Sequence, residues 1–241
     1  MTNHLSNHAK LMIAATAGVS LASLSQGVGQ VRDIASPTMI LLLAAGVLTS
    51  RLKVKLPGVM GNMSGNTPIV LLAILRLPLL GSLLIATVAA VAQSYAPGAK
   101  RPKPVQFLFN ACTVVNASGA AYWMFHNVNP DPRVSGRMLM LAASAAVYFL
   151  ANTLPVAAII AITEESSLFS LWRQVFLWSF PNYLIGAGLA GMVSVFSNAA
   201  GWQTLVVLTI ILFAVHQCYK VYVDRSQPQP QALVAAAAAG R

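Results

Sequence analysis

The chain has 241 residues, of which 57% are hydrophobic and only 8% are charged, whereas about a quarter of a soluble domain is charged, so a soluble globular protein is nearly excluded. Fifteen basic residues oppose five acidic ones, for a net charge of +10, and they stand singly or in threes between long apolar runs. Polytopic membrane proteins distribute charge in this way, whereas nucleic-acid-binding proteins gather it on a solvated face.

Eight apolar segments follow one another along the chain, and several approach the roughly 20 residues that a helix needs to cross a bilayer. They cover residues 11–29, 38–50, 68–77, 79–95, 105–125, 138–162, 180–198 and 203–221. The sequence therefore predicts an all-α protein, a polytopic transmembrane helical bundle with about seven to eight membrane segments. We expect a polar N-terminal tail over residues 1–10, an integral membrane domain over 11–222 and a flexible cytoplasmic tail over 223–241.

The basic residues predict the topology, because Lys and Arg in short loops favour the cytoplasm. If all eight segments cross, eleven of the fifteen basic residues fall on one side and four on the other. If residues 68–95 form one helix broken at Pro78, the split becomes six against eight, with Arg76 in the membrane. We therefore expect a multi-pass protein of the cell inner membrane with both termini in the cytoplasm. The first segment is either a retained helix or a signal peptide, and retention is favoured because no A-x-A cleavage pattern follows it.

An irregular polar stretch, residues 56–67, precedes the third segment, which is too short to cross a bilayer alone. Its three glycines and the polar side chains of Asn62, Ser64 and Asn66 disfavour helix. Thr67 is the predicted N-cap of the helix that follows. Non-helical backbone at membrane depth must be buried in protein or line a cavity, so the stretch is a candidate binding site. An ordinary cytoplasmic loop is the alternative.

Polar side chains also occur inside the spans. Ser144, Tyr148 and Asn152 follow one another at i,i+4 spacing, which places them on one helix face. Such a stripe should face protein or water, and other spans offer similar groups, so the sequence predicts a polar pocket between helices. The alternative is hydrogen bonding from helix to helix. The candidate ligand-binding residues are Asn62, Ser64, Asn66, Asn110, Thr113, Tyr148, Asn152 and Asn182.

Other patterns have structural rather than catalytic meaning. Residues 186–191 match G-x-G-x-x-G, but they lie within a span and no acid follows at the required distance, so we interpret them as a close helix–helix contact. Residues 167–178 predict an amphipathic helix at the membrane interface. Cys112 and Cys218 indicate neither a disulfide nor a metal site. Without a nucleophile–base pair, metal cluster or cofactor motif, the sequence predicts no enzyme, no metal site and no cofactor.

Three runs together resemble a known type of domain. They are KLPGVMGNMSGNTPIVLLAI at 55–74, RPKPVQFLFNACTVVNASGAAYWMFH at 101–126 and YFLANTLPVAAIIAITEESSLFSLWRQVFLWSFPNYLIGAGLAG at 148–191. The resemblance is to the membrane sensor module that precedes GGDEF or HD-type domains in some bacterial signalling proteins, and it covers about residues 50–220. This chain departs from that pattern because it stops soon after its last span. The resemblance implies that a separate partner makes any output.

A second resemblance covers only residues 53–95. The order of a lysine-containing entry, a polar loop, Pro68 and a short helix is similar to the substrate-binding subunits of energy-coupling-factor vitamin transporters. That resemblance implies ligand contact by the loop. We expect a membrane sensor that binds a small molecule or senses the membrane, and that signals to a cytoplasmic protein. The alternative is the substrate-binding subunit of a vitamin-like transporter, with other transporter subunits as partners. Nucleic acid is not an expected partner.

Overall fold

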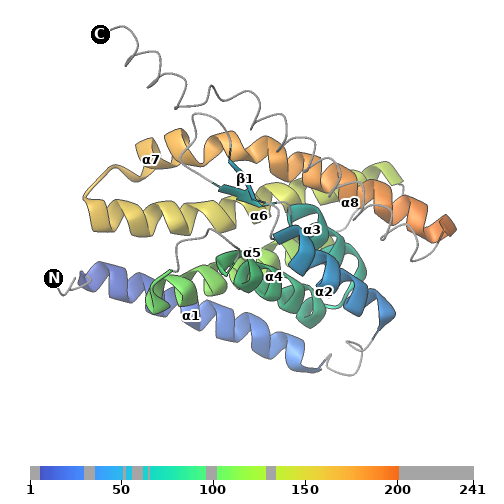
Figure 1. Ribbon diagram of the computed structural model, residues 1–241, viewed down its shortest axis with the longest axis horizontal. Coiled ribbons are helices and arrows are strands. Elements are labelled where there is room, and N and C mark those ends of the chain that lie inside the picture. Colours follow the sequence, from blue (N-terminus) through green and yellow to red (C-terminus); the bar gives the residue numbers. More distant parts are fainter. Residues whose placement is uncertain are drawn as a thin grey trace, which may run out of the picture.

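The computed structural model describes residues 6–29, 36–50, 53–55, 62–64, 66–95, 102–128 and 134–200. Within these residues the chain forms a bundle of helices and one small hairpin (Figure 1). The helices are α1 (Asn7–Gly27), α2 (Pro37–Ser50), α3 (Thr67–Arg76), α4 (Leu79–Ser94), α5 (Pro104–Asn127), α6 (Val134–Glu164), α7 (Leu168–Val175), the 3-10 turn η2 (Leu177–Ser179) and α8 (Phe180–Ala200). The all-α prediction is confirmed, and seven of the eight predicted apolar segments are helices. The eighth, 203–221, lies outside the described residues.

The stretch before α3 differs from the prediction in two respects. Residues 56–67 were expected to be irregular, but β2 (Asn62–Ser64) within them pairs antiparallel with β1 (Lys53–Lys55) just before them, with Lys53 opposite Ser64. The backbone N–H and C=O groups of these residues make no helical hydrogen bonds, so they pair with each other across the two strands. The N-cap of α3 is Asn66 rather than Thr67, which is already the first helical residue.

Helix α3 is the centre of the bundle. Every side chain from Thr67 to Ile74 is buried, and α2, α4, α5 and α8 all pack around it. A helix that is apolar on all sides is stable only when it is enclosed in this way. The adjoining α4 begins after Leu77 and Pro78, and the Ser82 hydroxyl donates to the Ala73 carbonyl at 3.0 Å. Nine residues of straight helix would separate these groups by about 13 Å, so the chain turns back between α3 and α4.

Helix α8 lies against α3 with little space between them. A Cβ on Gly186 would lie 3.0 Å from Thr67 Cγ2 and 3.4 Å from the Pro68 nitrogen. At the other end of α3, the Arg76 guanidinium donates to the Ser194 carbonyl of α8 at 2.7 Å. The two helices therefore run parallel, with Thr67 level with Gly186 and Arg76 level with Ser194. The close helix–helix contact predicted for residues 186–191 is confirmed.

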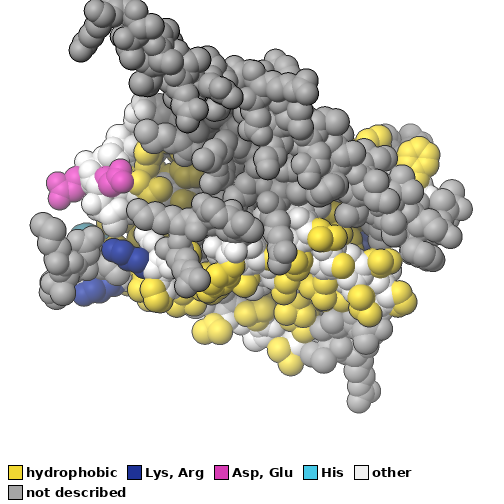
Figure 2. All heavy atoms as spheres, in the orientation of Figure 1, with side chains coloured by type: hydrophobic (Ala, Val, Ile, Leu, Met, Phe, Trp, Pro, Cys, Tyr) yellow, Lys and Arg dark blue, Asp and Glu magenta, His cyan; other side chains and the backbone are white. Residues whose placement is uncertain are grey.

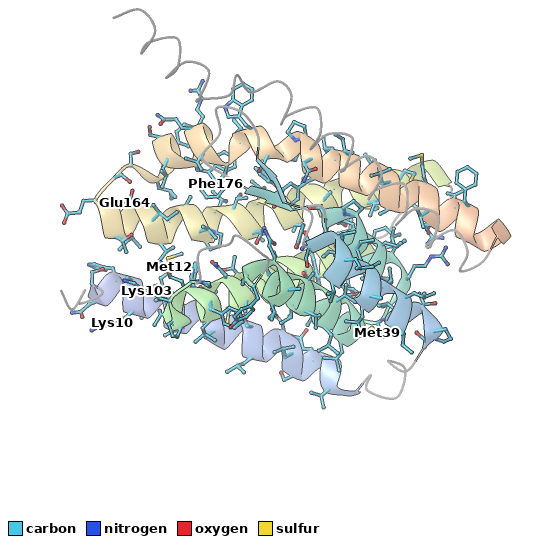
Figure 3. The ribbon with its side chains drawn as sticks, in the orientation of Figure 1. Lys10, Met12, Met39, Lys103, Glu164 and Phe176 are labelled. Carbon is cyan, nitrogen blue, oxygen red and sulfur yellow. The ribbon has the colours of Figure 1, made fainter. Side chains whose placement is uncertain are left out.

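Several charged side chains lie at one end of the bundle. Figure 3 labels Lys10 at the start of α1, Lys103 before α5 and Glu164 at the end of α6, and all three lie at that end. Arg76, by contrast, lies near Arg137 and donates to Ser194, fourteen residues after the first residue of α8. Hydrophobic side chains cover much of the remaining described surface (Figure 2). By length and composition, two described stretches are able to cross a membrane, Gly136–Glu164 and Leu168–Phe196. Helices α2, α3 and α4 are apolar but shorter.

Candidate functional site

Two buried tyrosines and a half-buried asparagine form a polar cluster between α6 and α8. Tyr148 and Asn152 lie one turn apart on α6, and Tyr183 is in the first turn of α8. The Asn152 side-chain amide donates to the Tyr183 hydroxyl at 3.0 Å. The two tyrosine rings are 5.7 Å apart between centroids, and only 4% and 9% of their surfaces are exposed. We call Tyr148, Asn152 and Tyr183 the polar seam.

Helix α5 closes the polar seam on the other side. The Tyr148 hydroxyl lies beside Ser118 of α5, and Ser144 lies one turn before Tyr148 on α6. Thr113 is five residues before Ser118. All three of the hydroxyl-bearing side chains Thr113, Ser118 and Ser144 are buried, and their oxygens have no hydrogen-bond partner among the described residues. Buried hydroxyls are usually hydrogen-bonded, so this surface has unused donors and acceptors.

An aromatic cluster joins the polar seam to α7. The Phe149 ring lies 5.1 Å from that of Tyr183 and 5.8 Å from that of Trp172 on α7. The indole Nε1 of Trp172 donates to the Thr153 hydroxyl at 3.0 Å, and that hydroxyl donates to the Phe149 carbonyl at 2.8 Å. Phe149 therefore contacts both the polar seam and α7. A movement of Tyr183 would displace a ring that α7 also packs against.

The exposed face of α7 carries Ser170, Arg173 and Gln174, with the large apolar side chain of Phe169 beside them. Phe169 is 69% exposed and Trp178, in the following turn, is 72% exposed. An amphipathic helix is confirmed over Leu168–Val175, whereas Leu177–Ser179 forms the separate turn η2, and a position at the membrane interface stays a prediction. Aromatic side chains of this kind are enriched where a membrane meets water.

The predicted site residues lie in different parts of the structure. Tyr148 and Asn152 belong to the polar seam, and Thr113 is buried on α5. Asn182 is half-buried next to Tyr183, whereas Asn110 is exposed on the surface of α5. Asn66 caps α3. Asn62 and Ser64 lie in β2, and their side chains are outside the described part of the chain.

Sequence reasoning missed a cap on the C-terminal end of α3. His126 of α5 places Nε2 2.9 Å from the Ile74 carbonyl. A carbonyl only accepts, so Nε2 carries the proton. With Ser82 on the Ala73 carbonyl, two side chains from neighbouring helices satisfy the last turn of the buried helix. The last carbonyls of any helix need such donors. The short apolar segment that forms α3 was therefore the signal that polar side chains of other helices should lie near its C-terminal end.

Helix α1 is joined to α5 by hydrogen bonds. The Ser20 hydroxyl lies 2.9 Å from the Cys112 carbonyl and 2.9 Å from Asn116 Oδ1, and the Asn116 amide donates to the Thr16 carbonyl at 3.0 Å. These groups have partners, unlike the hydroxyls beside the polar seam. The polar residues of α5 therefore serve two different purposes, with Asn116 joining helices and Ser118 facing the polar seam.

The chemistry of the polar seam is neutral. Its members are phenols, an amide and hydroxyls, which donate and accept hydrogen bonds without carrying charge at neutral pH. In the described part of the chain, no group of three or more His, Cys, Asp or Glu side chains is arranged to hold a metal ion. The arrangement is suited to recognising an uncharged hydrogen-bonding molecule.

Comparison with known proteins gives one match. The family model MASE9 matches residues 38–221, which includes α2 to α8 and the whole of the polar seam. No curated protein and no solved structure matches the chain. The resemblance to a membrane sensor module is therefore supported. None of the comparisons supports the resemblance to vitamin transporter subunits.

Proposed function

Because the chain belongs to the MASE9 family of membrane-associated sensory domains, we propose that it spans the membrane seven to eight times and relays a signal from a small uncharged ligand. The ligand binds at the polar seam, and α7 passes the change to a separate cytoplasmic protein. The chain acts without catalysis. The observation that carries this proposal is the hydrogen bond from Asn152 to Tyr183, because it joins two helices at neutral groups that a ligand can compete for.

The arrangement of charges supports the proposed orientation. Lys10, Lys103 and Glu164 lie at one end of the bundle (Figure 3), and this is the end that the basic residues of the sequence assign to the cytoplasm. Helix α7 directly follows Glu164 and a short turn, so it lies at the same end. A cytoplasmic partner would therefore meet α7 and the ends of α1, α5 and α6.

The depth of α3 supports a membrane-embedded hairpin. Thr67 lies level with Gly186, which is six residues, or about 9 Å, along α8 from its first residue, Phe180. Helix α3 therefore begins well inside the span of α8. Between α2 and α3 the described residues include the strands β1 and β2, whose backbone groups pair. Pairing satisfies backbone hydrogen bonds, which non-helical backbone at membrane depth requires.

The relay follows from the contacts around Phe149. A ligand that hydrogen-bonds to the Asn152 amide or to the Tyr183 hydroxyl breaks the hydrogen bond between these two side chains, and with it a link between α6 and α8. The Tyr183 ring then moves against Phe149, and Phe149 packs on Trp172 of α7. Because packed interiors are not continuously deformable, a small shift at the polar seam moves α7 as a unit.

A ligand panel tests the proposed function. The purified full-length chain is heated with matched panels of uncharged hydroxyl- or amide-bearing metabolites and of carboxylates and amines. We expect stabilisation by a member of the uncharged panel, and loss of that stabilisation in Tyr183→Phe and Asn152→Leu. Asn110→Ala, which changes an exposed asparagine away from the polar seam, is the matched control and keeps the response. Stabilisation by charged compounds alone, or stabilisation that survives both seam variants, would contradict the proposal.

A further inference from the structure

Two arginines, one from α3 and one from α6, approach the same turn of α8. The Arg76 guanidinium donates to the Ser194 carbonyl at 2.7 Å, which holds this side chain against α8. Arg137 directly precedes Met138 on α6, and a Cβ on Gly191 would lie 2.6 Å from Met138 Sδ. Gly191 and Ser194 are about 4.5 Å apart along the helix axis. The contacts therefore bring two exposed arginines to one level of α8.

This level is far from the end of the bundle that holds Glu164. Arg137 is 27 residues before Glu164, or about 40 Å along α6. Helix α3 ends at Arg76, and His126, in the last turn of α5, bonds the Ile74 carbonyl two residues before that arginine. The ends of α3 and α5 and the start of α6 therefore lie together. In the proposed orientation they form the non-cytoplasmic end of the bundle, opposite α7.

The charge at this end is positive. Among the described residues, the acidic side chains are Glu164 and Glu165, and both lie at the other end. The loops that join α1 to α2 and α5 to α6, residues 30–35 and 129–133, each contain one arginine and one aspartate, so they add no net charge. The two arginines at the level of Ser194 therefore create a positive potential that attracts an anion.

We propose that Arg76 and Arg137 bind the phosphate of an anionic phospholipid headgroup. Guanidinium groups are planar and present pairs of N–H donors that match phosphate oxygens. Trp123, one turn before the end of α5, is 61% exposed, and tryptophan is enriched at the depth of lipid headgroups. Leu139 of α6 and Val195 of α8 are exposed in the neighbouring turns and offer contact to the acyl chains. A zwitterionic lipid binds less well, because its ammonium group would meet two guanidiniums.

Lipid binding to the intact full-length chain in detergent, followed by native mass spectrometry, tests the site. We expect phosphatidylglycerol to bind more tightly than phosphatidylcholine with the same acyl chains. Arg137→Gln should weaken phosphatidylglycerol binding about fivefold. Arg173→Gln removes an exposed arginine at the other end of the bundle, so it is the matched control and keeps the affinity. Equal binding of the two lipids, or equal affinities of the two variants, would overturn the proposal.

Arg76→Gln needs a second readout, because it also loses the bond to Ser194. Its Tm without lipid measures the loss of that bond, and the further rise in Tm on adding phosphatidylglycerol measures the lipid site. We expect this rise to be smaller than in the unaltered chain, and a rise of equal size would overturn the role of Arg76.

Two competing explanations are separated by the same binding assay. Inorganic phosphate and glycerol 3-phosphate, added in large excess, should leave phosphatidylglycerol bound, and displacement by either would assign the site to a dissolved phosphate instead. The inference rests on the proposed membrane orientation but not on a ligand at the polar seam. Tyr183→Phe should therefore bind the lipid as the unaltered chain does, and a loss of binding there would place the lipid at the polar seam and overturn the proposal.

Discussion

The contact between α3 and α8 predicts opposite effects for two glycines on the same helix. A Cβ at Gly186 would lie 3.0 Å from Thr67 Cγ2, 3.3 Å from Thr67 Cβ and 3.4 Å from the Pro68 nitrogen. A Cβ at Gly188 would meet nothing within 4 Å. Replacing glycine by alanine inside a helix stabilises it by about 1 kcal/mol, but overpacking a tight contact costs about 1–3 kcal/mol. Gly188→Ala is therefore stabilising, and Gly186→Ala is neutral to destabilising.

The expected difference in the free energy of unfolding between the two variants is about 2 kcal/mol. Both variants gain the same helix propensity from alanine, and only Gly186→Ala brings a Cβ into a tight contact. For a chain of this size, that difference corresponds to roughly 4–8 °C in Tm. Thermal unfolding of the purified chain in detergent, followed by circular dichroism, measures it directly. Equal Tm values for the two variants would refute the close parallel packing of α3 on α8.

Three further contacts make separate predictions. His126→Ala leaves the Ile74 carbonyl without its donor and lowers the free energy of unfolding by about 1 kcal/mol in denaturant titration. An unchanged unfolding midpoint would show that the hydrogen bond does not stabilise the fold. Ser20→Ala removes the hydroxyl between α1 and α5 and costs about 0.6 kcal/mol in the same titration, whereas a gain in stability would refute the contact. Trp172→Phe keeps an aromatic ring but loses the N–H donor to Thr153. Helix α7 then detaches from α6 more often, and trypsin cleaves faster after the exposed Arg173. An unchanged cleavage rate would argue against this attachment.

The helices could be predicted from the sequence because burial and composition act locally. Apolar segments bounded by Pro, Asn or charged residues gave helix positions such as 105–125 for Pro104–Asn127. The stripe on α6 followed from i,i+4 spacing alone. Asn110 was misleading because spacing does not show which side of a helix its neighbours cover, and the adjacent Phe109 is buried while Asn110 is not. It lies in the second turn of α5 and is exposed, whereas Thr113 is covered.

The remaining features depend on contacts between residues distant in the sequence. The pairing of β1 with β2 places Lys53 opposite Ser64, a register that two strands of three residues do not reveal in the sequence. The cap from His126 on Ile74 spans 52 residues, and the bond from Trp172 to Thr153 needs α7 to fold back on α6. Periodicity shows which face of a helix is polar, but it does not show which partner that face meets.

The central claim is that the polar seam controls the position of α7, and one distance measures this most directly. Spin labels are placed at Arg173→Cys on α7 and Lys103→Cys before α5, both exposed, in a chain whose two native cysteines are replaced. In lipid bilayers, the distance distribution between the labels should shift in Tyr183→Phe, which removes the hydroxyl that Asn152 donates to. It should not shift in Asn110→Ala. An α7 position that is the same in all three proteins would contradict the account.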